Sequence, residues 1–265
     1  MHKIYTHIIV FVASICLLPL ASHAQDISPT LWRRGWRLAI GGGGQLILNP
    51  YRQHALTNPL IQFPVSGPTL RFTQLEWFWN AHWGATIYFN ASNSKLPDEA
   101  AFRTALSLRY PDQFLTFAAP LLPEYTSAEV LQVLIGVKYQ LLCARRWCFQ
   151  PGLAIGSTEF NQYPRHADIK QAGTHALINL WLTPDSASFG PKPAPFTLAA
   201  SGTGVYTLSR RWNLFVQMEY AWIKPKLRWT FIELDQSTGI LKKENIEYRR
   251  ALHGLNVTLG VAFHL

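Results

Sequence analysis

The sequence predicts an all-β protein, an eight-stranded antiparallel transmembrane β-barrel with short periplasmic turns and long extracellular loops. Three observations predict it: apolar residues recur at every second position, short and long connections alternate along the chain, and seven of the ten Trp lie near the predicted periplasmic edge. The composition agrees, because 48% of the residues are hydrophobic and only 15% are charged, against about 25% charged in an average soluble domain. This composition excludes a disordered chain.

The start of the chain has the pattern of a secretory signal peptide. Lys3 precedes an apolar run over residues 8–18, and Pro19 ends that run. Small residues then stand where a signal peptidase cleaves, and the run is shorter than the ~20 residues of a membrane-spanning helix. The expected segments are a signal peptide over residues 1–24, cleaved near Ala24-Gln25, a periplasmic N-terminal segment over 25–35 and the barrel over 36–265.

Eight segments alternate between apolar and polar residues. In residues 255–265, Leu, Val and Phe occupy the odd positions, while Asn, Thr, His and small residues occupy the even ones. Such a segment has about the length of a tilted strand that crosses a bilayer. The first strand is expected to pair with the last, because lipid offers no hydrogen bonds to an open edge. The expected strands cover residues 36–48, 74–79, 83–89, 131–141, 147–155 (with a bulge or local shift at Pro151), 196–208, 212–222 and 255–265.

The connections between these segments fall into two classes. Three short ones end in a basic residue or His followed by Trp, at residues 80–83, 144–147 and 209–212. The others are long: 49–68, 93–127, 158–195 and 226–250. Barrels of the Gram-negative outer membrane have this pattern, with the short turns in the periplasm. The alternation continues on both sides of residues 235–239, so the last hairpin is expected to protrude beyond the membrane, and the Pro-rich residues 184–195 are expected to form an extended outer loop.

Aromatic side chains are expected to form girdles at the two membrane interfaces, where a Trp ring is buried while its N–H group stays hydrated. The alternative is that they belong to the core of a soluble β-sandwich. Tyr220 and Trp222 lie eight and ten residues beyond Trp212, which places them at the outer interface. The expected girdle residues are Trp36, Trp77, Trp79, Trp83, Trp147, Trp212, Tyr220 and Trp222.

Four charged residues fall on the inward faces of the expected strands: Arg37, Glu76, Lys138 and Glu219. An unpaired charge inside a narrow barrel is very costly, so we expect an ionic network in the lumen, with Arg37 and Glu76 as its first pair. This network is either the gate of a narrow channel or a structural plug. Side chains about fill the interior of eight strands, which favours the plug.

Cys143 and Cys148 are the two cysteines beyond the expected signal peptide. Export to an oxidising compartment allows them to form a disulfide across a hairpin turn, and two free thiols are the alternative. Zinc needs more ligands than this pair offers, and no cluster of Cys or His supplies them. The sequence therefore predicts no metal and no cofactor.

Catalysis would require a nucleophile within hydrogen-bonding reach of its base. The candidates for a lipid-modifying site near the outer leaflet are His175, Asp185, Ser186 and His253, but they lie in expected loops and at strand ends without a compact motif. No known catalytic signature such as GxSxG or HExxH is present. We therefore expect a non-catalytic, structural or accessory protein whose loops meet a partner or ligand, with an enzyme and a narrow channel as the alternatives.

The formal net charge of +9 favours anionic neighbours. Arg145, Arg146, Arg210 and Arg211 are placed to meet headgroups of the inner leaflet, and the basic residues of the last hairpin are placed to meet lipopolysaccharide. A protein partner in the outer membrane is also expected, because loops on a rigid barrel usually carry binding. Nucleic acid is not an expected partner, because the chain is exported.

The segment Trp147-Cys148-Phe149-Gln150-Pro151-Gly152-Leu153-Ala154-Ile155-Gly156 resembles the W-x-x-Q-P-G-L-x-x-G strand of small outer-membrane β-barrel proteins of Bacteroidetes. These belong to the broad family that includes the PorT-like barrels. The resemblance covers the expected architecture, and in sequence only this strand and the C-terminal one. It implies an outer-membrane location and assigns no catalytic residue.

Overall fold

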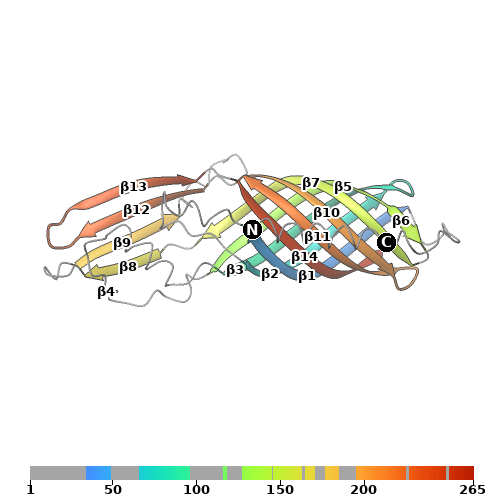
Figure 1. Cartoon of the computed structure of the whole chain (residues 1–265), viewed down its shortest axis with the longest axis horizontal. Helices are drawn as coiled ribbons and strands as arrows, with labels where there is room; N and C mark the ends of the chain where they lie inside the picture. Colours follow the sequence, from blue (N-terminus) through green and yellow to red (C-terminus); the bar gives the residue numbers. More distant parts are fainter. Residues whose placement is uncertain are drawn as a thin grey trace, which may run out of the picture.

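A computed structural model describes residues 34–48, 66–95, 116–117, 127–144, 146–162, 165–170, 177–184, 195–224, 227–248 and 251–265. The expected signal peptide with its cleavage site lies outside these residues, as does most of the Pro-rich loop. Within the described ranges, no helix is long and apolar enough to cross a membrane. The chain forms a closed β-barrel and a second sheet beyond one end of it (Figure 1).

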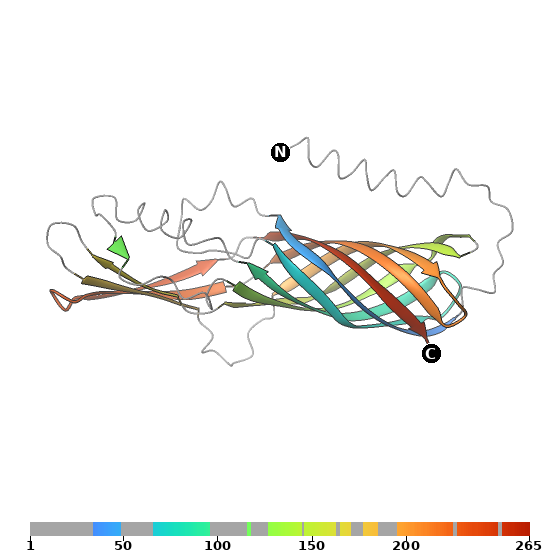
Figure 2. The ribbon, with the colours of Figure 1, turned by 90° about the horizontal axis from the view of Figure 1, so that it is seen from below.

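Eight antiparallel strands form the barrel, which confirms the predicted fold class. Each strand pairs with the next along the chain, β7 pairs with β10, and β1 closes the barrel against β14 from Arg37 opposite His264 to Leu48 opposite His253. The strands tilt strongly around the barrel axis (Figure 2). They are β1 (Gly35–Leu48), β2 (Ser66–Phe78), β3 (Trp83–Lys95), β5 (Ser127–Tyr139), β7 (Trp147–Gln162), β10 (Phe196–Thr207), β11 (Trp212–Lys224) and β14 (Leu252–His264).

The short strand β6 (Leu141–Ala144) continues from β5 along β7. The ladder between β5 and β7 stops at Lys138 opposite Gly152, and β6 resumes it at Leu141 opposite Phe149. Pro151, which has no N–H group to donate, lies in this interruption. The expected local shift therefore occurs between β5 and β6, which pair with one edge of β7. The other edge of β7 pairs with β10 through Pro151 without a break.

The barrel wall is apolar outside and polar inside, the reverse of a soluble protein. On β5 the outward Leu131, Val133 and Ile135 are exposed, whereas the inward Gln132 and Lys138 are buried. A 13-residue strand such as β11 rises about 43 Å and, tilted by about 40°, spans about 33 Å. This slightly exceeds a hydrocarbon thickness of about 30 Å. The outer surface therefore has the polarity and height of a membrane-spanning wall.

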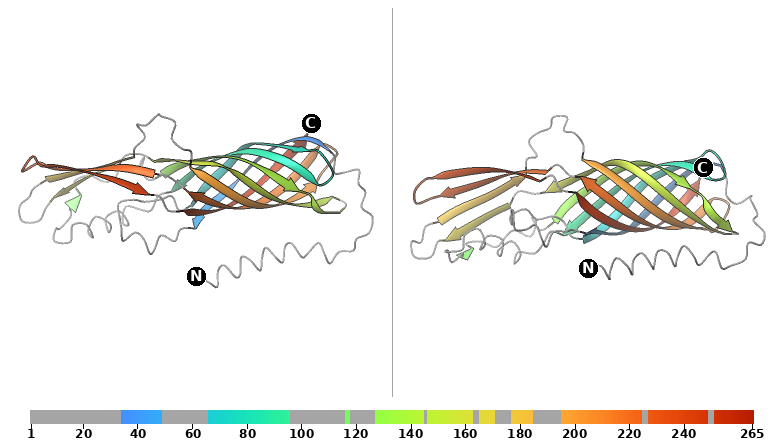
Figure 3. Two further views of the ribbon diagram at one scale, coloured as in Figure 1. Left: turned by 90° about the horizontal axis from the view of Figure 1, so that it is seen from above. Right: turned by 45° about the horizontal axis from the view of Figure 1, so that its top comes forward.

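The second sheet lies beyond the barrel end opposite the C-terminus (Figure 3). Its strand order is β13 (Leu241–Tyr248), β12 (Leu227–Asp235), β9 (Leu177–Pro184), β8 (Arg165–Lys170) and β4 (Thr116–Phe117). The β12–β13 hairpin protrudes as predicted. Its turn is closed by hydrogen bonds to Asp235 from the Ser237 side chain and from the backbone N–H groups of Ser237 and Thr238, which hold the pKa of that carboxyl below its usual value.

The prediction of a continuous loop over residues 158–195 was wrong in part. β7 extends to Gln162, and β8 and β9 follow it. Alternation does not reveal β9, because Ile178, Asn179 and Leu180 are buried in succession. β9 pairs with β12 of the protruding hairpin, from Asp235 opposite Ile178 to Trp229 opposite Pro184. It is therefore a tertiary contact that makes this segment a strand.

Glycines at the contact of β5 and β7 allow the two strands to approach closely. A Cβ atom at Gly156 would overlap the carbonyl oxygen of Val133 on β5, whereas a Cβ atom at Gly204 on β10 would lie 4.0 Å from its nearest neighbour, the Val216 oxygen. The oxygen of Val133 belongs to the ladder, so it cannot move without distorting the wall.

We predict that Gly156→Ala destabilises the folded barrel by about 1–3 kcal/mol, the usual cost of overpacking, while Gly204→Ala changes it little. The measurement is urea-induced unfolding in detergent micelles, followed by tryptophan fluorescence. Equal effects of the two substitutions would contradict this account of the β5–β7 contact.

Candidate functional site: the charged interior of the barrel

The inward positions of the barrel strands carry a buried ion pair at mid-height. Arg71 on β2 and Glu219 on β11 lie on well-separated strands, and Arg71 Nη2 is 3.3 Å from Glu219 Oε2 across the lumen, with both side chains fully buried. The Arg71 guanidinium also lies over the Tyr88 ring, 4.4 Å from its centre. A buried pair of this kind is tolerated only when further hydrogen bonds satisfy both groups.

Four donors surround the Glu219 carboxylate. Besides Arg71, Tyr88 donates its hydroxyl to Oε2 at 2.7 Å, Gln217 donates to Oε2 at 3.3 Å, and Asn256 donates to Oε1 at 3.1 Å. The donors come from β2, β3, β11 and β14, so the carboxylate ties together strands from opposite parts of the wall. This arrangement fixes the cross-section of the barrel.

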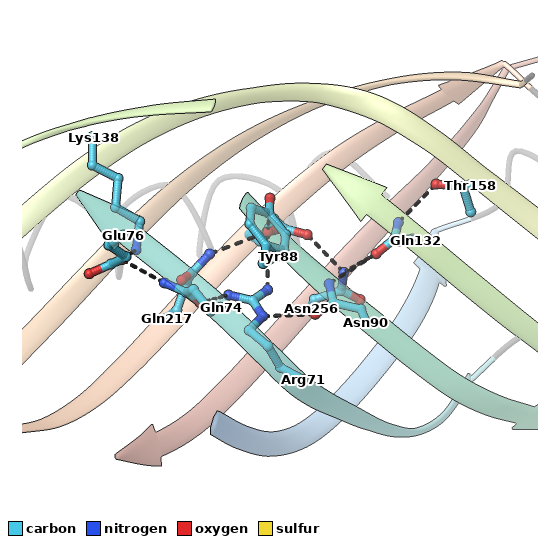
Figure 4. Close-up of polar contacts among 11 residues, drawn as sticks. Arg71, Gln74, Glu76, Tyr88, Asn90, Gln132, Lys138, Thr158, Gln217 and Asn256 are labelled. Atoms are coloured by element: carbon cyan, nitrogen blue, oxygen red, sulfur yellow. Dashed lines mark hydrogen bonds and ion pairs between the residues drawn. The ribbon is translucent and has the colours of Figure 1, made fainter. Parts of the chain in front are cut away.

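Arg71 is held by two more partners. Its Nε donates to Asn90 Oδ1 at 2.8 Å and its Nη1 donates to Gln74 Oε1 at 2.9 Å. From Asn90 the network continues to Gln132 Oε1 at 3.2 Å, and Gln132 donates to Thr158 Oγ1 at 3.1 Å (Figure 4). The network therefore crosses from β2 to β7 along one level of the lumen.

A second cluster lies nearer the short turns. Lys138 Nζ is 2.5 Å from Glu76 Oε1, and Gln74 donates to the same oxygen at 2.6 Å. Arg37 is the direct cross-strand neighbour of Glu76, and its guanidinium lies 4.2 Å from the centre of the Phe78 ring. Because Gln74 accepts from Arg71 and donates to Glu76, it joins the two clusters into one network (Figure 4).

Side chains fill the lumen at this level. Within the described part of the chain, a cavity of about 10 Å³ is found beside the second cluster, a volume comparable to one water molecule. Towards the second sheet, buried apolar residues of the barrel such as Ile47, Ile223 and Leu252 join the same core as Trp229 and Phe231 of β12. The described interior therefore contains a polar plug beneath an apolar cap.

The structure brings together the four charged residues named from the sequence. Arg37, Glu76, Lys138 and Glu219 are all buried in the lumen. Glu76 was expected to pair first with Arg37, its cross-strand neighbour, but its short contact is with Lys138, which reaches it from β5. Glu219 pairs instead with Arg71.

Arg71 is the central residue that the sequence did not reveal. Alternation extended upward from Glu76 and Gln74 would place Arg71 on the lipid face. A β-bulge at Phe72 reverses the alternation, since β2 advances from Arg71 to Thr73 while β3 changes only from Asn90 to Phe89. The available signal was the charge itself, because an Arg facing hydrocarbon at mid-strand is costly enough to suggest a bulge.

The named aromatic residues lie on the outer surface at the two ends of the barrel. Near the short turns, ring contacts join Trp36 to Trp77 and Trp77 to Trp79, with centres 5.8 and 5.9 Å apart. The other contacts there are Trp83 with Tyr139, Trp147 with Tyr206 and Trp212 with Phe263. Towards the second sheet, Tyr220 contacts His253 and Trp222 contacts Phe196.

The expected disulfide is present, because Cys143 and Cys148 join β6 to β7. Of the proposed catalytic residues, His175, Asp185 and Ser186 lie outside the described residues, while His253 is on β14 with Nδ1 2.5 Å from the Tyr220 hydroxyl. Over the ranges that the structure describes, no group of three His, Cys, Asp or Glu side chains could hold a metal ion.

The closed strand order, apolar outer wall and filled lumen define a membrane-spanning β-barrel. No family model matches the sequence, and no curated protein does, so the resemblance to the Bacteroidetes barrels stands on its motif alone.

Solved structures similar to this chain include OprG from Pseudomonas aeruginosa, with 12% identity over 91% of this chain and 100% of that one and a TM-score of 0.45. They also include a major outer membrane protein from Thermus thermophilus, with 9% identity over 87% and 99% of the chains and a TM-score of 0.42. A third is the outer membrane protein AlkL, with 10% identity over 92% and 94% and a TM-score of 0.39. At this level of similarity no function is transferred.

We predict that Glu219→Gln lowers the free energy of unfolding by about 3–5 kcal/mol, because it leaves the Arg71 charge buried without its counter-ion. The double variant Arg71→Met with Glu219→Gln recovers most of this loss. Lys242→Gln, which removes the ion pair between the 71% exposed Lys242 and Glu233 on the hairpin, changes stability by less than about 1 kcal/mol. Urea titration in micelles measures all three, and a double variant no more stable than the single one would contradict the pairing.

Proposed function

We propose that this protein is a non-catalytic barrel of the Gram-negative outer membrane with a closed lumen, and that the sheet beyond the barrel presents a surface to a partner or ligand. A relationship to the PorT-like barrels of Bacteroidetes is part of the proposal. The single observation that carries it is the continuous hydrogen-bonded network through the lumen, with a cavity of only about 10 Å³ beside it. Such an interior favours a structural plug over a conducting pore.

The charged groups at the barrel rims support an outer-membrane setting. Arg210 and Arg211 are exposed at a short turn, and Lys224 is exposed at the opposite end of β11. With the short turns in the periplasm, the first two meet phospholipid headgroups, and Lys224 meets anionic lipopolysaccharide together with Arg228 and Lys242 beyond it. The contact with lipid and lipopolysaccharide is therefore electrostatic on both sides.

We predict that the wild-type barrel reconstituted in a planar lipid bilayer gives no current steps above the lipid baseline. Removing the central bulk with Arg71→Ala and Glu219→Ala opens the lumen to ions and produces steps. The matched pair Leu70→Ala and Val216→Ala, which shortens two exposed residues of the outer wall, remains silent. Conductance by the wild type would overturn the plug in favour of the narrow channel.

The second sheet has an exposed face and an exposed tip beyond the barrel. One of its faces is buried through Ile169, Leu180 and Phe231. On β8 and β9, an exposed His166 ring stacks on Trp181 at 5.2 Å and contacts Asp168 at 2.8 Å. At the tip of the β12–β13 hairpin, Ile240 and Leu241 are more than half exposed, at 54% and 62%. Two large exposed apolar residues at the most protruding turn favour contact with another protein.

We predict that cross-linking in native membranes joins the wild-type chain to a discrete partner, and that Ile240→Ser with Leu241→Ser reduces the yield at least about tenfold. Each buried apolar side chain contributes about 1.5–3 kcal/mol, and 1.4 kcal/mol is tenfold in affinity. Lys242→Ser is the matched control at the same turn and keeps the cross-link. An unchanged yield in the tip variant would exclude the hairpin tip as the contact.

The non-catalytic role is distinguished from a lipid-modifying enzyme by the membrane lipids themselves. Cells that overproduce the protein and cells that lack it should have the same lipid A mass profile. A mass shift that disappears with Ser186→Ala, His175→Ala or His253→Ala would replace the accessory role with enzymatic activity.

A further inference from the structure

The small cavity beside the second cluster has a polar wall whose hydrogen bonds are incomplete. Gln150 on β7 and Thr203 on β10 are direct cross-strand neighbours and line the cavity, and they are only 1% and 2% exposed. Both amide atoms of Gln150 and the hydroxyl of Thr203 are buried with no hydrogen-bond partner in the described part of the protein. Buried polar groups almost always have a partner, so three such atoms around one cavity indicate a bound molecule.

A third polar side chain of the same wall comes from the next strand. Asn213 on β11 also lines the cavity. Its Nδ2 is 2.8 Å from His264 Nε2, while its Oδ1 is buried with no partner among the described residues. An amide offers both a donor and an acceptor, and a hydroxyl serves as either. The wall formed by β7, β10 and β11 therefore suits a ligand that both donates and accepts hydrogen bonds.

The other wall of the cavity carries charges of both signs. Arg37 on β1, Glu76 on β2 and Lys138 on β5 line it, and Lys138 is paired with Glu76. An ion of either sign in this cavity would lie beside a group of like charge, and repulsion between like charges is strong in a medium of low dielectric constant. A neutral polar molecule meets no such repulsion. The mixed lining therefore favours a neutral ligand.

The size of the cavity limits the ligand to one very small molecule. Its volume of about 10 Å³ is close to that of a single water-sized probe, and a buried water typically has about three polar partners. Gln150, Thr203 and Asn213 supply that number from three neighbouring strands. We propose that this cavity is a binding site for one structural water molecule, which is hydrogen-bonded to these three side chains.

The bound water extends the plug across the barrel at the level of the second cluster. At mid-height, Glu219 receives donors from four strands. In the second cluster, the contacts of Lys138 and Gln74 with Glu76 join β2 to β5. A water between the two walls adds β7, β10 and β11 to the hydrogen-bonded network of this level. The inference deepens the proposed plug, but its tests do not depend on conductance.

The first test is a crystal structure of the wild-type chain at a resolution that shows ordered water. The expected result is one density peak within hydrogen-bonding distance of Gln150 and Thr203, with no anomalous signal there in crystals grown in sodium bromide or rubidium chloride. Anomalous signal in the cavity would identify an ion and overturn the proposal. A cavity without density would be dry, and this result would overturn it as well.

The second test measures whether Gln150 and Asn213, whose strands are separated by β10, are coupled through the cavity. In micelles, Gln150→Met and Asn213→Leu each lower the thermal midpoint, because either change leaves the water with too few partners. The loss in the double variant should be smaller than the sum of the single losses by at least about 2 °C.

The matched control combines Gln150→Met with Thr86→Val. Thr86 on β3 is also buried with an unpartnered hydroxyl among the described residues, but it does not line the cavity. Its loss should add to that of Gln150→Met. Additive losses for Gln150 with Asn213, or equal coupling in both pairs, would overturn the proposal.

Discussion

The whole structure depends on one constraint: in hydrocarbon, every backbone N–H and C=O group must find its partner within the protein. The pairing of β1 with β14 meets it, because this contact turns an open sheet into a barrel without edges. Closure then sets which side chains face lipid. Alternate residues face lipid on one side and a narrow lumen on the other, so the lipid-facing residues are apolar and the polar residues of the strands lie inside.

Because the lumen is narrow, its polar side chains form a plug. Eight strands enclose a space that side chains fill, and the enclosed charges must then satisfy one another. Glu219 collects donors from four strands, and Gln74 links it through Arg71 to the cluster of Glu76 and Lys138. A network of this kind is strong only when it is complete, because low dielectric raises the cost of each missing partner. Gln150 and Thr203 have buried side-chain atoms without a hydrogen-bond partner in the described part of the protein, so the network is incomplete beside them.

Stability and interaction belong to different parts of the molecule: the barrel with its plug provides stability, and the second sheet provides surface for interaction. The barrel satisfies its own hydrogen bonds and presents a smooth apolar wall to lipid, whereas the sheet beyond it has a buried apolar face and exposed polar and apolar groups on its other face and its tip. Since the lumen is filled, the surface available to other molecules lies mainly beyond the membrane. This division is the basis for proposing an accessory protein that works through its protruding strands.

The sequence by itself determined the eight strands, their antiparallel order, the inward position of Arg37, Glu76, Lys138 and Glu219, and the protruding hairpin. A period of two repeated against hydrocarbon leaves little ambiguity in these features. Only the tertiary structure decided the ion pairs, because the bulge at Phe72 turns Arg71 inward and the barrel's curvature brings Lys138 rather than Arg37 into the short contact with Glu76. It also decided β9, whose pairing with the hairpin buries successive residues, and β8, which pairs with β9. Periodicity reports which face a residue occupies, whereas distances across a closed barrel depend on strand register and stagger that no single segment contains.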